Sequence, residues 1–137
     1  MKNVNILSIS LGLISLTFGS LKFVSPFKDW YAKQIKASGL PHASYALGIA
    51  GEIIIGIIFL FPFTIRVSDK PKRLLLISAN ISFCIMMMFA IIVHLIPKVP
   101  ASVLPLKIKI PFIPLLFLCI AIFNLTQIAK TTGHEFK

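Results

Sequence analysis

The chain has 137 residues and a formal net charge of +10, and 57% of its residues are hydrophobic while 13% are charged. Soluble domains are about half apolar and about a quarter charged, so this balance is typical of a polytopic membrane protein of one domain, 1–137. The positive charge does not indicate nucleic acid as a partner, because Lys and Arg stand in short segments between apolar runs, as membrane-flanking residues do. The two cysteines lie inside apolar runs and indicate no secreted disulfide framework.

Four apolar runs are long enough to cross a bilayer as helices, at about 5–24, 43–63, 74–96 and 112–128. We therefore expect an all-α polytopic protein that forms a bundle of four transmembrane helices in a lipid bilayer. Four crossings place both termini on one side. The 14 Lys and Arg residues divide equally between the two sides, so their number does not fix the orientation. The dense basic segment 66–73 favours the cytoplasm, and with it cytoplasmic termini.

The first run carries small residues on one helical face and ends in a lysine. Ser8, Gly12, Ser15, Gly19 and Lys22 recur at spacings of four, three, four and three residues. Small residues mark close helix contacts in membranes, so we expect Gly12 and Gly19 to pack against another helix. A cleaved signal peptide is the alternative interpretation, but it would need no such face. Lys22 either anchors the run at the headgroups or continues this face into the bundle.

The connection between the first two runs, residues 25–44, predicts a short amphipathic helix. One side of that helix would hold Phe27, Trp30, Tyr31, Gln34 and Ile35. We expect this side to rest on the membrane surface and the helix to end at a glycine, residue 39.

The other two connections are expected to be non-helical. Segment 66–73 is predicted to be a tight basic loop with Pro71 as a helix breaker. Segment 97–111 is rich in proline and predicts an irregular connection. Lys alternates with apolar residues over 106–110, which favours a short strand-like piece there.

The second run holds one carboxylate, Glu52, among otherwise apolar residues. An ionised Glu at that depth costs about 3 kcal/mol on insertion scales, so the chain must pair, protonate or hydrate it. Gly48 and Gly56 lie four residues before and after Glu52 and share its helical face. We therefore expect these glycines to pack closely and the carboxylate to point into the bundle.

The topology brings several polar residues to one side of the membrane. The first run ends, the second begins and the third ends there, so Lys22, Glu52 and His94 are candidates for one buried polar site, with Asn80 as a polar neighbour. Such groups serve as proton relays or ligand sites. The alternative is a single ion pair that fixes helix register. The sequence shows no catalytic, metal-ligand or phosphate-loop motif, so no catalytic residue, metal or cofactor is assigned.

Three motifs together resemble a known family. They are an F-G-x-x-K-F pattern at 18–23, a G-L-P sequence at 39–41 and a G-x-x-x-E-x-x-x-G pattern at 48–56. In this order and spacing they resemble the DoxX-like membrane proteins, within the wider group that includes MauE. The resemblance covers all four runs in outline, while its specific motifs lie in the first 60 or so residues.

The resemblance implies a four-helix bundle in the bacterial cytoplasmic membrane. Lys22, Glu52, Gly19, Gly48 and Gly56 carry over on the matching positions, whereas His94 does not. Because some members are subunits of quinone-linked oxidoreductase complexes, we expect a membrane subunit that binds a quinone, a similar amphiphile or another membrane protein. The alternatives are a non-enzymatic chaperone or assembly factor, in which the Lys–Glu pair is structural, and a small transporter, which would need a homo-oligomer.

Overall fold

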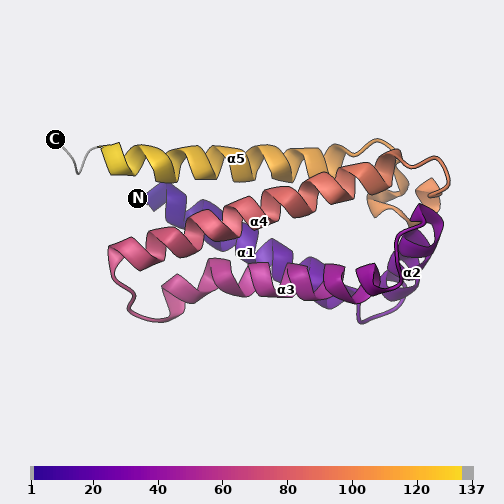
Figure 1. The fold of residues 1–137 in the computed structure, drawn as a ribbon, viewed down its shortest axis with the longest axis horizontal. Coiled ribbons are helices and arrows are strands. Elements are labelled where there is room, and N and C mark those ends of the chain that lie inside the picture. The colour runs from indigo at the N-terminus through magenta and orange to yellow at the C-terminus, as the bar shows by residue number, and fades with distance from the viewer. Residues whose placement is uncertain (1, 134–137) are drawn as a thin grey trace.

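The structure, a computed structural model, describes residues 2–133. In this part of the chain, four long helices lie side by side and a shorter one crosses one end of the bundle (Figure 1). The elements are α1 (Lys2–Leu21), α2 (Phe27–Ser38), α3 (Ala43–Thr64), α4 (Asp69–Leu95), the 3-10 turns η1 (Ala101–Val103) and η2 (Pro105–Lys107), and α5 (Phe112–Gly133). The described residues form no strand, which confirms the expected all-α fold.

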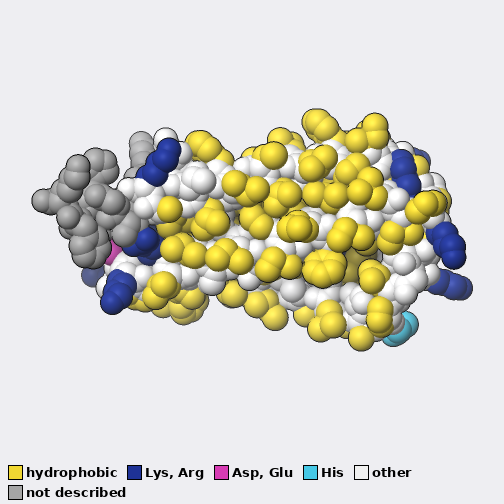
Figure 2. Space-filling model, turned by 45° about the horizontal axis from the view of Figure 1, so that its top comes forward, with side chains coloured by type: hydrophobic (Ala, Val, Ile, Leu, Met, Phe, Trp, Pro, Cys, Tyr) yellow, Lys and Arg dark blue, Asp and Glu magenta, His cyan; other side chains and the backbone are white. Residues whose placement is uncertain are grey.

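The helices α1, α3, α4 and α5 are each long and apolar enough to cross a membrane. Apolar side chains cover the middle of the molecule, and Lys and Arg side chains gather near its two ends (Figure 2). A lipid bilayer is the environment that fits such a surface, so the chain is a multi-pass membrane protein. The start of α1, the α3–α4 connection and the end of α5 lie at one end of the bundle (Figure 1).

The basic segment 66–73 is largely helical, contrary to the prediction of a loop. Helix α4 begins at Asp69, after the extended Ser68. Pro71 stands in the first turn, where backbone N–H groups have no partner within the helix, so a proline is compatible with the helix there. The third spanning helix therefore starts five residues before the predicted position 74.

The proline-rich connection 97–111 contains two 3-10 turns and not the expected strand-like piece at 106–110. Leu106 and Lys107 adopt positive φ angles of 55° and 56°, which turn the chain away from an extended path. The Lys109 ammonium donates hydrogen bonds to the backbone carbonyls of Ile96 and Val99, just after α4 ends. These bonds fold the connection back over the end of that helix.

Helices α1 and α3 approach closely where glycines face each other. A Cβ atom built on Gly56 would lie 2.6 Å from Leu16 Cγ and 2.9 Å from the Gly12 carbonyl oxygen. A Cβ on Gly12 would lie 2.8 Å from the Phe59 Cβ. Any side chain at these positions would push the two backbones apart, so the predicted small-residue faces hold α1 against α3.

A buried polar cluster ties α1, α4 and α5 together in the core. The Asn124 amide nitrogen donates to Ser8 Oγ over 2.9 Å and to Asn80 Oδ1 over 3.2 Å. The Asn80 amide in turn donates to the Leu76 carbonyl. All three polar side chains are fully buried, so this cluster fixes the register of three helices.

Gly56→Ala should destabilise the fold by about 1–3 kcal/mol, because the added methyl group meets backbone as well as a side chain. The matched control is Gly51→Ala on the same helix, whose new Cβ would meet only the mobile methyl of Met86 at 3.0 Å. We expect Gly51→Ala to change stability by less than about 0.5 kcal/mol. Reversible unfolding in mixed micelles measures both, and equal losses would contradict the close α1–α3 contact.

Candidate functional site

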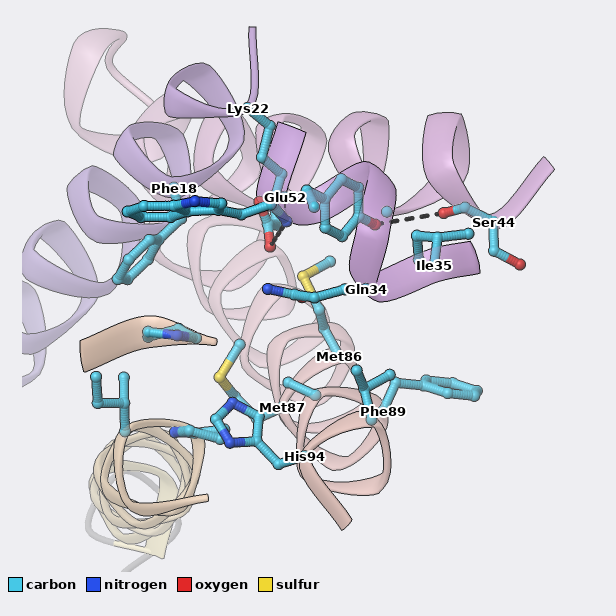
Figure 3. A pocket seen from close by; sticks show the side chains of 18 of the residues that line it. Phe18, Lys22, Gln34, Ile35, Ser44, Glu52, Met86, Met87, Phe89 and His94 are labelled. Atoms are coloured by element: carbon cyan, nitrogen blue, oxygen red, sulfur yellow. Dashed lines mark hydrogen bonds and ion pairs between the residues drawn. The ribbon is translucent and has the colours of Figure 1, made fainter. Parts of the chain in front are cut away.

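A cavity of about 780 Å³ lies at the end of the bundle that α2 crosses. All five helices and the connection 97–111 contribute to its walls, which are mostly apolar (Figure 3). The polar side chains among its lining residues are few: Lys22, Tyr31, Gln34, Ser44, Glu52, Ser82 and His94. A concave, apolar space with a few convergent polar groups is the usual form of a small-molecule site.

An ion pair joins α1 to α3 at the wall of this cavity. Lys22 follows the last residue of α1, and its ammonium lies 2.5 Å from Glu52 Oε1. The two side chains are only 16% and 14% exposed, so Lys22 turns into the bundle and does not reach for the headgroups. The second oxygen, Glu52 Oε2, is buried and has no hydrogen-bond partner within residues 2–133.

Tyr31 from α2 covers the ion pair. The Lys22 ammonium lies 4.0 Å from the centre of its ring, a cation–π contact, and its hydroxyl donates to the Ser44 carbonyl over 3.4 Å. A Cβ on Gly48 would overlap that hydroxyl, so Gly48 makes room for the tyrosine and not for another helix backbone. Burial, and secondarily the Glu52 charge, raises the Tyr31 pKa to about 12.

The apolar side of α2 faces the cavity, whereas the sequence predicted that it would rest on the membrane. Phe27, Trp30, Tyr31, Gln34 and Ile35 all line the cavity. The Gln34 amide donates to the Val103 carbonyl and so fastens α2 to the connection 97–111. An amphipathic helix can rest on a lipid surface or cover an apolar cavity, as α2 does here, and its sequence pattern is the same in both cases. We call α2 the roof helix of the cavity.

The structure brings His94 to this site but not Asn80. His94 is 4% exposed and lines the cavity with Lys22 and Glu52. Its Nδ1 atom has no hydrogen-bond partner in the described part of the chain, while the Lys109 backbone hydrogen-bonds its ring. Asn80 does not line the cavity. Grouping it with Lys22 and Glu52 was therefore wrong, because its amide is engaged by Asn124 in the core.

The cavity opens toward lipid between α3 and α4. Leu47 on α3 and Ile85 and Phe89 on α4 line the cavity and are also 70%, 51% and 60% exposed. The two helices diverge toward the end that α2 crosses (Figure 1). An amphiphile dissolved in the bilayer therefore has a sideways path to the ion pair.

The Lys22–Glu52 pair predicts strong coupling in a double-mutant cycle. Lys22→Met and Glu52→Gln should each destabilise the fold, and the double variant should be more stable than the sum of the two losses by about 0.5–3 kcal/mol. Unfolding in mixed micelles measures the cycle, and the exposed Lys33→Met is the control for removing a lysine. Additive losses would show that the two groups do not interact.

The environment of Tyr31 predicts an unusual titration. In a Tyr45→Phe background, which leaves Tyr31 as the single tyrosine, the phenolate absorbance should rise with a midpoint at about 12. Adding Glu52→Gln should lower that midpoint, because a negative charge is removed. The folded protein keeps this proton where an unfolded chain loses it, so stability should fall as pH rises from 10.0 toward about 12. A midpoint at the ordinary value would disprove the buried contact.

Comparison with known proteins identifies no relative of this chain. No protein-family model matches it, and no curated protein and no solved structure does so either. The resemblance to DoxX-like proteins therefore rests on its motifs alone.

Proposed function

We propose that the chain is a DoxX-like membrane subunit that binds a quinone or a similar amphiphile from the lipid phase. One observation carries the proposal: the Lys22–Glu52 pair lies on the wall of a cavity that opens toward lipid. A ring-bearing amphiphile would place its polar head beside the pair and its tail among the apolar walls. The opening between α3 and α4 suits a ligand that arrives through the bilayer.

The same geometry favours ligand binding over a chaperone role. A chaperone would have a dry, fully paired Lys–Glu contact and an exposed small-residue or polar helix face for a partner. Here Glu52 Oε2 lacks a partner among the described residues, and the small face of α1 is buried inside the chain. That face is already used against α3 and α5, through Gly12, Ser15 and Ser8.

A small transporter is the weaker alternative. Transporters commonly place their sites at discontinuous helices near mid-membrane, whereas α3 and α4 run unbroken past the cavity. A transporter also needs a continuous polar path, whereas the few polar residues that line this cavity stand among apolar ones.

The resemblance and the positions of the basic residues together suggest the membrane and the orientation of the protein. A DoxX-like subunit would lie in the bacterial cytoplasmic membrane, with the basic residues around the start of α4 on the cytoplasmic side together with the termini. Conversion between a quinone and its quinol moves two electrons and two protons. Lys22, Glu52 and His94 would handle hydrogen bonds and protons, and an electron-carrying partner subunit would exchange the electrons.

Trp30 provides a direct test, because it is the single tryptophan of the chain and lines the cavity. Titrating decylubiquinone into protein in lipid nanodiscs should quench its fluorescence with a saturable component. Ala90→Leu, which fills the cavity, should weaken that component about tenfold. The matched control, Ala50→Leu, lies on an exposed position of α3 outside the cavity and should leave it unchanged. Quenching that never saturates in any variant would refute the proposed site.

A further inference from the structure

We propose that the cavity selects the reduced, dihydroxy form of its ligand, a quinol, over the quinone. The inference rests on the proposed function and names the chemical form that the site takes. Its basis is a mismatch of hydrogen-bonding groups in the cavity, where two buried acceptors stand without a donor. A quinol carries two O–H donors at opposite ends of one ring, whereas a quinone presents only acceptors in their place.

The first free acceptor is Glu52 Oε2. Its sister oxygen Oε1 receives the Lys22 ammonium at 2.5 Å, so the carboxylate is held as the anion of an ion pair. An ionised carboxylate only accepts hydrogen bonds. Oε2 is buried and has no partner within residues 2–133, although the cavity adjoins its side chain. Leaving such an atom unpaired is unfavourable, so a ligand donor there would be stabilising.

The second free acceptor is His94 Nδ1, on a side chain that is 4% exposed. A neutral imidazole has one donor and one acceptor nitrogen. The Lys109 backbone hydrogen-bonds the ring, and because Nδ1 has no partner, this bond is made by Nε2. A backbone carbonyl only accepts hydrogen bonds, so Nε2 carries the proton. Nδ1 is then the acceptor, and it belongs to a residue that lines the same cavity as Glu52.

Three donor groups of the cavity are directed at protein groups. The Gln34 amide donates to the Val103 carbonyl and the Tyr31 hydroxyl donates to Ser44. The Lys22 ammonium faces Glu52 Oε1 and the Tyr31 ring. The Trp30 indole N–H and the Ser82 hydroxyl also belong to lining residues and can donate to either form of the ligand. A quinone has no donor of its own, so it would leave both free acceptors unpaired.

Glu52 and His94 also stand on different helices, so a ligand between them is held at two points. Glu52 comes from the middle of α3 and His94 from the last turn of α4, and both side chains are drawn at the same cavity in Figure 3. The side chains of Gln34, Met86 and Met87 lie between them in that view. Two acceptors on different helices that line one cavity suit a ring with two opposed hydroxyl groups.

The test compares three probes of nearly the same shape by calorimetry, with the full chain in lipid nanodiscs under anaerobic, reducing conditions where needed. The probes are decylubiquinol, decylubiquinone and the dimethyl ether of decylubiquinol, which keeps the ring but has no O–H donor. We expect the quinol to bind at least about tenfold more tightly than either other probe. His94→Phe should weaken quinol binding about tenfold and leave quinone binding nearly unchanged. The matched control, His42→Phe, replaces an exposed histidine outside the cavity and should have no effect.

The outcomes separate this inference from the proposed function. Equal affinity for quinol and quinone, or equal affinity for quinol and its dimethyl ether, overturns the selectivity while still supporting an amphiphile site. The comparison of the three probes on the unmodified chain decides this point without any variant, so a failure of His94→Phe to fold does not affect it. No binding of any probe above that of empty nanodiscs overturns the selectivity and the proposed function together.

Discussion

The close contact of α1 with α3 is the constraint on which the rest of the structure depends. Because Gly12 and Gly56 lack side chains, the two backbones approach closely enough for Ser15 to donate to the Glu52 carbonyl over 2.7 Å. The same approach brings the end of α1 beside the middle of α3, where the Lys22 ammonium meets the carboxylate of Glu52. Helix packing and the polar site are thus one arrangement, since the ion pair continues the face that the glycines begin.

That contact also explains why the cavity lies where it does. The interior near the α3–α4 connection is filled by large side chains such as Phe59 and Leu76, which are buried and do not line the cavity. Toward the other end α3 follows α1 while α4 diverges (Figure 1), and the cavity lies at that end. The roof helix α2 covers this space without filling it. A chain of this size would gain stability by closing the gap, so an open cavity with unpaired polar atoms is the kind of local cost that proteins keep at functional sites.

The features that depend on helical periodicity could be predicted from the sequence. The features that could not be predicted depend on which element packs against a given helix face. Four spans, the small-residue face and the inward direction of Lys22 all follow from spacings of three and four residues. Spacing does not say whether α2 lies on lipid or on the cavity, nor that Tyr31 occupies the room left by Gly48. The prediction for Asn80 was wrong for the same reason. Its helix and its depth in the membrane could be predicted, but its partner Asn124 lies on α5, where the sequence pattern shows no polar face.

The roof and the opening serve two different purposes in this arrangement. Tyr31 and Gln34 hold α2 over the polar end by bonds to Ser44 and Val103, and the lysines of α2 stay exposed on its outer side. The ion pair beneath α2 is largely buried, its side chains 16% and 14% exposed, and such a pair is stronger in a medium of low dielectric constant. The opening between α3 and α4 has no such polar fastening and is bordered by apolar side chains, Leu47 and Phe89 among them. The side of the cavity under α2 is therefore covered, while the side between α3 and α4 is bordered by exposed apolar residues, and this asymmetry suits the proposed membrane-dissolved ligand.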